Sequence, residues 1–192
     1  MPRPADPTLP DRILKAAESV VVAEGHEALN MRTLARLARV SATTIYAHFS
    51  SKAALRRALE LRVADRLNES IRRIDPTLEP FETLAEIGRQ YIAFAEANPR
   101  LYRLMFDGLD GTPISDEERS VMYFTYYSAR NALERAATSG LIPHQPAYSA
   151  MMGWSMLHGF ASLMLSGRLQ LAEDMDQEQL QELFMAFYAG PH

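Results

Sequence analysis

The stretch that decides the fold is NMRTLARLARVSATTIYAHFSSK, residues 30–52. It predicts two short helices joined by a tight turn, with a third helix beginning at Lys52. The side chains on one face of the middle helix are too polar and too small to form a core. They are able to contact a phosphate or a base edge. Those side chains are Ser41, Thr43, Thr44, Tyr46 and His48. A helix-turn-helix places such chemistry in the major groove of DNA.

Polar residues mark where these helices begin. Asn30 is expected to cap the helix whose buried face is Leu34, Ala35 and Ala38, and Ser41 is expected to cap the next one. Ser50 or Ser51 is the expected cap of a long helix over residues 52–74, which carries an apolar residue at every third or fourth position. Upstream, a helix over residues 11–24 is expected to end at Gly25, where a glycine relieves the strain of helix termination.

The rest of the chain has helical periodicity and no hairpin signal, so we expect an all-α protein of about nine helices. Further helices are expected over residues 81–97, over 99–106 after an Asn98-Pro99 start, over 148–166 and over 176–189. A loop is expected at 107–113. Ser115 and Glu118 form a capping box for a helix of about twenty residues that Gly140 closes. We expect a helix-turn-helix DNA-binding domain at 8–55, bridged by the helix at 52–74 to a helical regulatory and dimerisation domain at 75–192.

Composition and charge narrow the class of protein. The chain has 192 residues, 47% of them hydrophobic, and no apolar run long enough for a membrane span. It has no cysteine, and its five histidines lack metal-ligand spacing, so we expect neither a metal nor a cofactor. The N-terminus lacks a signal-peptide core, which favours a cytoplasmic protein. Residues 1–73 carry a net charge of +5 and residues 74–192 carry −9. This asymmetry suits an N-terminal part that binds a polyanion; the alternative is chance segregation of surface charge.

The last two helices differ in kind. The helix at 148–166 is apolar almost all round and carries a stripe of small residues at Ser155, Gly159, Ser162 and Ser166. The final helix has an apolar stripe at Leu180, Leu183, Phe184, Phe187 and Tyr188. A helix that is apolar on every side must be covered on every side. Packing within the chain is one possibility; a homodimer formed through these two helices is the interpretation we favour.

The segment from Arg12 to Leu61 resembles the DNA-binding domain of the tetracycline-repressor (TetR/AcrR) family. The matching features are Ile-x-x-Ala-Ala at 13–17, Ala-Glu-Gly at 23–25, MRTLARLA at 31–38 and VSATTIYAHFSSK at 40–52, followed by Leu55. The segments at 98–106 and 154–169 resemble a regulatory domain of one subgroup, which is marked by a Trp-x-x-x-His-Gly pattern. The usual glycine of the turn is Arg39 here, and a left-handed arginine costs roughly 1 kcal/mol. Either Arg39 tolerates that conformation or the turn differs; Arg39 is also placed to reach a phosphate.

The resemblance implies that the helix at 42–49 enters the major groove. Ala42, Thr43 and Thr44 are small enough for close approach to base edges, whereas Tyr46 and His48 suit phosphate contacts. Lys52, one of only two lysines, stands at a helix start that favours a phosphate. Arg32 and Thr33 open the preceding helix and are expected to contact phosphate too, while Ile45 and Phe49 point inward.

Plainer interpretations of the same residues stay open. Tyr46 is alternatively a half-buried core residue, and His48 an ordinary surface residue. Thr43 and Thr44 are alternatively helix-start residues without a base contact. Arg32 and Lys52 are alternatively solvated charges.

Aromatic and methionine side chains gather in the later part of the chain, where they are candidates for a ligand pocket between helices. The predicted ligand-binding residues are Tyr91, Tyr102, Met105, Phe106, Met122, Tyr123, Tyr126, Tyr127, Trp154 and His158, with Phe94, Met152 and Met156 as further candidates. Such residues at helical spacing are also ordinary core, and His158 is alternatively buried against a neighbour. The excess of carboxylates argues against a large anionic ligand, so we expect an apolar or aromatic effector.

These features predict a sequence-specific transcriptional regulator that binds a palindromic operator as a dimer. We expect a repressor that a small-molecule effector releases by tilting the fourth helix, at a coupling of about 1–3 kcal/mol. The recognition helices of the dimer are expected about one DNA turn apart. The alternative is a constitutive helix-turn-helix protein without an effector. No nucleophile triad, phosphate loop or metalloprotease motif supports an enzyme.

Overall fold

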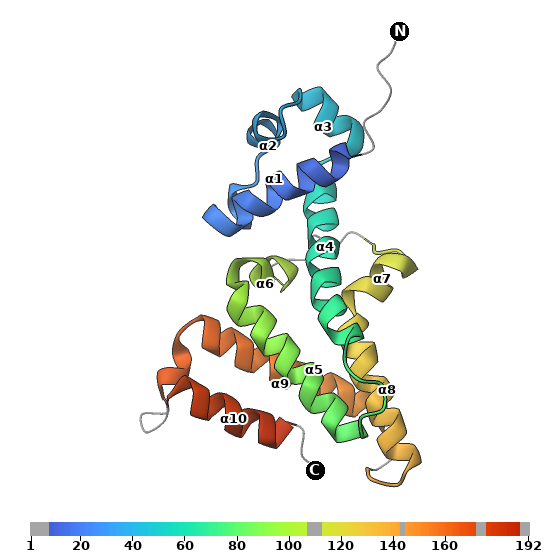
Figure 1. Ribbon diagram of the computed structural model, residues 1–192. Helices are drawn as coiled ribbons and strands as arrows, with labels where there is room; N and C mark the ends of the chain where they lie inside the picture. Colours follow the sequence, from blue (N-terminus) through green and yellow to red (C-terminus); the bar gives the residue numbers. More distant parts are fainter. Residues whose placement is uncertain (1–7, 107–112, 143–144, 172–175, 189–192) are drawn as a thin grey trace. The chain divides into compact units, whose positions relative to one another are not determined.

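The computed structural model describes residues 8–106, 113–142, 145–171 and 176–188 (Figure 1). Within those ranges the chain forms ten α-helices, two short 3-10 helices and no strand, which confirms the all-α prediction. Two compact units are present, one of residues 1–64 with 100–113 and one of residues 65–99 with 114–192. None of the described helices combines the length and apolar character needed to cross a bilayer.

The first unit is built from α1 (Leu9–Glu24), a 3-10 turn (His26–Ala28), α2 (Met31–Ala38), α3 (Ala42–His48), the first part of α4 (Lys52–Arg72) and most of α6 (Pro99–Phe106). Its core contains fully buried side chains from the first four helices, including Ile13, Leu34, Ile45 and Leu59. Gly25 ends α1 with φ of 92°, a conformation that favours glycine, and its N–H donates to the Val21 carbonyl at 2.9 Å.

Ion pairs and hydrogen bonds tie the helices of this unit together. Arg62 of α4 donates to the carboxylate of Asp11 and lies 3.6 Å from that of Glu18, both on α1. Arg100 of α6 donates to the carbonyl of Val22 at 2.8 Å. These bonds join segments distant in sequence, so they fix the position of α1 against its neighbours.

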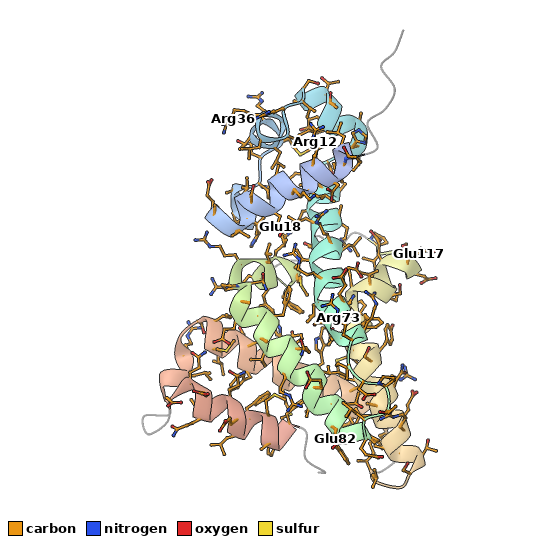
Figure 2. All side chains as sticks on the ribbon, viewed as in Figure 1. Arg12, Glu18, Arg36, Arg73, Glu82 and Glu117 are labelled. Carbon is orange, nitrogen blue, oxygen red and sulfur yellow. The ribbon has the colours of Figure 1, made fainter. Side chains whose placement is uncertain are left out.

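The second unit contains the end of α4, α5 (Pro80–Ala97), α7 (Asp116–Met122), α8 (Phe124–Thr138), α9 (Pro146–Leu165), a 3-10 turn (Arg168–Leu171) and α10 (Gln177–Tyr188). Helices α5, α8 and α9 pack on one another, and α10 packs on α5 and α9 (Figure 1). Leu84, Ile92, Leu133 and Leu157 are buried between them. Glu79 and Glu82 form a reciprocal capping box at the start of α5; Figure 2 labels Glu82.

The predicted helix of about twenty residues after Ser115 is wrong in its length, because it breaks at Tyr123 into α7 and α8. The capping box of Ser115 and Glu118 is confirmed, with bonds of 2.8 and 3.2 Å. The amide of Asn68 donates to the carbonyl of Val121 at 2.8 Å, two residues before the break. A side chain that inserts into the backbone ladder interrupts a helix in this way.

Other predicted boundaries are largely confirmed. Gly140, with φ of 71°, follows the end of α8, and the N–H of Leu141 donates to the carbonyl of Ala136 in the pattern of a left-handed helix cap. Pro99 is the first residue of α6, as predicted. The predicted loop at 107–113 lies almost entirely outside the described residues.

The apolar stripe predicted for the final helix contains both exposed and packed side chains. Leu183 and Phe187 are 54% and 59% exposed, whereas Met185 is the buried residue of α10. Phe184 stacks on Phe160 of α9 with ring centroids 4.2 Å apart. The outer side of α9 is exposed as well, through Tyr148, Met151, Met152 and Leu163. Packing within the chain therefore leaves an apolar face of α9 and α10 in solvent.

Candidate nucleic-acid interface

Helices α2 and α3 are held in place by the caps that the sequence predicted. The side-chain oxygen of Asn30 accepts from the N–H groups of Arg32 at 2.9 Å and Thr33 at 3.4 Å. The Ser41 hydroxyl accepts from the N–H of Thr44 at 3.0 Å. The Ser41 and Thr44 hydroxyl oxygens also lie 2.7 Å apart. The first turn of α3 is thereby ordered before any partner binds.

The turn between α2 and α3 has Arg39 in the left-handed conformation, with φ of 55° and ψ of 48°. Arg39 is the only non-glycine residue with positive φ in the described part of the chain. Its N–H donates to the carbonyl of Arg36, and the N–H of Val40 donates to the carbonyl of Ala35 at 2.9 Å. The sequence left open whether Arg39 tolerates the left-handed conformation of the usual glycine or the turn differs; Arg39 adopts the left-handed conformation.

Helix α3 has one buried and one exposed side. Ile45 is fully buried and Phe49 is 9% exposed, so the prediction that both point inward is confirmed. Thr43 and Ala47 are exposed on the opposite side, one turn apart. Both are small, so nothing on this face prevents the backbone from approaching a base edge closely.

The structure brings the predicted contact residues to the start of α2, to α3 and to the start of α4. Arg32, Ser41, Thr43, Tyr46, His48 and Lys52 are exposed, and Thr33, Ala42 and Thr44 are partly exposed. Tyr46 is 52% exposed, so about half of its surface is open to solvent. The ammonium of Lys52 lies 3.4 Å from the carbonyl of Glu27, in an exposed hydrogen bond that a stronger acceptor can replace. Ser51 caps α4 through a 3.0 Å bond from the N–H of Ala54.

Family comparisons match both parts of this chain. Residues 13–59 match the family described as "Bacterial regulatory proteins, tetR family". Residues 84–187, more than half of the chain, match the family described as "Tetracyclin repressor-like, C-terminal domain". The chain belongs to the TetR family. The TetR assignment makes it a helix-turn-helix transcriptional regulator with a helical C-terminal domain.

Similar proteins share this TetR architecture. An uncharacterized HTH-type transcriptional regulator of Mycobacterium tuberculosis is 24% identical over 88% of this chain and 74% of its own length. A protein of unknown function from Rhodococcus sp. RHA1 has the same fold with a TM-score of 0.78 at 22% identity, covering 98% of this chain and 97% of its own. A putative TetR-family regulator from Vibrio parahaemolyticus superposes with a TM-score of 0.70 at 21% identity, over 93% of this chain and 95% of its own.

The second unit of this TetR protein brings four predicted ligand-binding residues together. Tyr123, Tyr126, Tyr127 and Trp154 form an aromatic cluster between α8 and α9. The rings of Tyr123 and Tyr126 lie 6.0 and 6.1 Å from that of Trp154, and the rings of Tyr126 and Tyr127 lie 5.3 Å apart. Met122 and His158 are partly exposed in the same unit, where Tyr91 is buried. Tyr102, Met105 and Phe106 belong to α6 in the first unit, with the rings of Tyr102 and Phe106 4.9 Å apart.

A different set of residues in the second unit lines a cavity of about 480 Å³ that is partly open to solvent. Its walls come from α5, α8, α9, α10 and the segment before α9: Phe81, Leu84, Ala129, Leu133, Ile142, Gln145, Tyr148, Ser149, Ala150, Met152, Gly153, Met156 and Tyr188. Of the candidates from sequence, only Met152 and Met156 line it.

Sequence reasoning missed several positions that the structure makes relevant. Ala47 shares the exposed face of α3 with Thr43, and its helical spacing was the available signal. Arg12 of α1 donates to the carbonyl of Ala38 at 2.7 Å and so holds the end of α2 next to the turn. Gln145 and Ser149 line the cavity, and no pattern in the sequence distinguished them from surface residues.

Proposed function

We propose that this regulator binds a palindromic operator as a homodimer and is released from it by a small-molecule effector. The DNA contacts come from Arg32, Thr33, Ser41, Ala42, Thr43, Thr44, Tyr46, His48 and Lys52. The functional division is a DNA-binding domain at 8–55, with the helix at 52–74 leading to a regulatory domain at 75–192. The Trp-x-x-x-His-Gly pattern at 154–159 assigns the chain to one subgroup of the family.

The observation that supports this function best is the two-sided character of α3. Its inner side is fixed in the core by Ile45 and Phe49, and its outer side presents small and polar groups to solvent. A rigid helix with such a surface reads base edges through Thr43 and Thr44, while Tyr46, His48 and Lys52 position it on phosphates.

The exposed apolar face of α9 and α10 supports the homodimer. Tyr148, Met151, Met152, Leu183 and Phe187 are large apolar side chains left in solvent. Large apolar side chains exposed on neighbouring helices often mark a surface that another protein surface covers. A second copy of the chain supplies that surface, and with it the second recognition helix that a palindromic operator requires.

The cavity in the second unit supports an effector over constitutive DNA binding. A volume of about 480 Å³ falls within the range of small-molecule sites. A ligand that prefers one arrangement of the helices shifts the protein toward that arrangement and lowers the affinity for the operator. The sequence-predicted residues Tyr91, Tyr102, Met105, Phe106, Met122, Tyr123, Tyr126, Tyr127, Trp154 and His158 remain proposed members of the effector-responsive region.

Duplexes recovered by in vitro selection from a random library test the DNA-binding surface. Fluorescence anisotropy of the full chain on a selected duplex is measured over a salt series. Lys52→Ala is expected to reduce the slope of log K against log salt by about 1.8, roughly 0.9 for each copy in the dimer, and to weaken all sequences alike. Thr43→Ala is expected to alter the preferred bases instead.

The other lysine of the chain is the matched control. Lys15 is exposed on α1 and pairs with Asp11 at 2.9 Å. Lys15→Ala is expected to leave the salt slope unchanged. The assignment fails if Lys52→Ala changes base preference, if Lys15→Ala reduces the slope equally, or if no duplex binds at low ionic strength.

A further inference from the structure

The described residues that line the cavity of the second unit carry no charged side chain. Phe81 and Leu84 of α5, Leu133 of α8 and Met156 of α9 supply most of the apolar lining. Among the described lining residues there is no aspartate, glutamate, lysine, arginine or histidine. An ion that enters such a site loses its hydration without gaining a counter-charge, which opposes the binding of ionised ligands.

Three residues with polar side chains are among the described lining residues. Gln145 and Ser149 are one helical turn apart at the start of α9, and Tyr188 is at the end of α10. Within the part of the chain that the structure describes, the amide of Gln145 and the hydroxyls of Ser149 and Tyr188 have no hydrogen bond to another residue. A few unpaired polar groups on an apolar wall are what orients a small ligand.

Tyr188 is held in a fixed position. A Cβ atom at Gly88 of α5 would lie 3.1 Å from one edge of its ring, and a Cβ atom at Gly153 of α9 would lie 3.2 Å from the opposite edge. The absence of side chains at these two glycines is therefore what admits the ring. Burial raises the pKa of the Tyr188 phenol above its ordinary value, so the group stays protonated and remains a hydrogen-bond donor.

The aromatic cluster that the sequence singled out is a weaker candidate for the same role. The rings of Tyr123 and Tyr126 both pack against that of Trp154, and the Tyr126 hydroxyl donates to the carbonyl of Ala147 at 3.4 Å. Aromatic rings packed against one another in this way are typical of a filled core. The uncharged cavity, by contrast, combines open volume with unpaired polar groups.

We propose that the cavity between α5, α8, α9 and α10 binds a neutral, largely apolar small molecule carrying a hydroxyl or carbonyl group, which hydrogen-bonds to Tyr188 and Ser149. This inference rests on the proposed function, because the ligand is the effector of the regulator. It goes further in assigning both the location of the effector and its chemistry.

The probes are 4-hexylphenol and 4-hexylbenzoate, which have similar size and differ in charge at neutral pH. Isothermal titration calorimetry on the full chain is expected to show saturable binding of 4-hexylphenol. The benzoate is expected to bind more than about tenfold more weakly, because its carboxylate finds no cation among the described lining residues. Equal affinity for the two probes, or no saturable binding of the phenol up to its solubility limit, would overturn the proposal.

Two variants locate the site. Ser149→Leu fills the cavity and removes a hydroxyl, and it is expected to abolish phenol binding. Tyr188→Phe keeps the ring and removes one hydrogen bond, which is expected to weaken binding roughly two- to tenfold. The matched control is Ser120→Leu at an exposed position of α7, which is expected to leave the affinity unchanged. Tyr126→Phe is measured beside it to test the aromatic cluster as the alternative site.

Circular dichroism of each variant confirms that it is folded before its affinity is compared. If Tyr126→Phe weakens binding and Tyr188→Phe does not, the effector site lies at the aromatic cluster and the cavity proposal is wrong. Calorimetry is carried out without DNA, and operator binding is measured separately. A protein that binds its operator but not the phenol therefore refutes only the cavity site, and one that binds the phenol but no duplex refutes only the proposed function.

Discussion

The guanidinium of Arg12 donates to the backbone carbonyl of Ala38, 26 residues away, at 2.7 Å. Ala38 is the last residue of α2, so Arg12 satisfies a carbonyl that the end of the helix leaves without an intrahelical partner. The bond attaches α1 to the segment that leads directly into the turn and α3. Figure 2 shows Arg12 on α1 and labels Arg36 on α2, whose side chain points outward.

Arg12→Ala is expected to lower the free energy of unfolding by about 1 kcal/mol, since it removes a charge-assisted hydrogen bond at a helix end. Arg36→Ala, at an exposed position of the same unit, is the control and is expected to change stability by less than about 0.5 kcal/mol. Urea unfolding followed by circular dichroism measures both. Equal losses would show that the contact with Ala38 contributes nothing specific.

Replacement of Arg39 by glycine is expected to stabilise the protein. Arg39 has positive φ, which strains an L-residue and not a glycine. The gain is expected to reach about 1 kcal/mol, reduced by the greater freedom of glycine in the unfolded chain. Arg36→Gly, within α2, is expected to cost about 1 kcal/mol instead, because glycine disfavours a helix interior. Opposite signs at these two positions in urea unfolding confirm the prediction, and equal signs contradict it.

Asp11 makes the stability of the first unit dependent on pH. Hydrogen bonds from Arg62, and secondarily from Lys15, lower the pKa of Asp11 below its ordinary 3.8. Because the pKa is lower in the folded state, the stabilisation is fully present above the unfolded-state pKa and is lost as the pH falls through the folded-state pKa. Asp11→Asn is therefore expected to flatten the decline in stability below about pH 4.

Urea unfolding at a series of pH values between neutrality and the acid transition measures this effect. Lys15→Met is the companion variant, and it is expected to retain most of the decline because Arg62 is the larger cause of the shift. The assignment is wrong if Asp11→Asn leaves the acid limb unchanged.

Gly88 and Gly153 are expected to act together through the ring of Tyr188. Alanine at either position brings a methyl group to within 3.1 or 3.2 Å of that ring, and at Gly88 also to within 2.6 Å of the Met185 methyl. Overpacking of this kind costs about 1–3 kcal/mol. The double variant is expected to lose more than the two single variants together, because the ring then has no side toward which to move. Gly159→Ala, with nothing within 4 Å of its Cβ position, is the control in thermal unfolding at equal protein concentration.

The features that the sequence predicted correctly depend on residues close together in the chain. Asn30, Ser41 and Ser51 cap the helices that follow them because each cap needs only a side chain and an N–H two or three positions later. The burial of Ile45 follows in the same way from the helical period. Local chemistry was therefore sufficient to place α3 and its exposed side.

The features that it did not predict depend on residues distant in the chain. The break at Tyr123 accompanies a bond from Asn68 to Val121 across 53 positions, and neither residue type predicts such a bond. The cavity requires four helices at defined separations, and the two glycines that admit Tyr188 look like ordinary small residues in the sequence. The prediction placed the pocket near Trp154 because aromatic residues gather there, whereas the described lining of the cavity does not include Trp154.

The exposed apolar face of α9 and α10 gives the last prediction. Leu183 of α10 and Val22 of α1 are both 54% exposed, so each is accessible to the same degree in a single copy of the chain. Leu183→Glu places a charge in the proposed dimer interface, where desolvation without a partner opposes association. It is expected to produce folded monomers in sedimentation velocity and to weaken operator binding. Val22→Glu is expected to remain dimeric with unchanged affinity; a dimeric Leu183→Glu protein, or a wild-type protein that is monomeric throughout, would place the interface elsewhere or remove it.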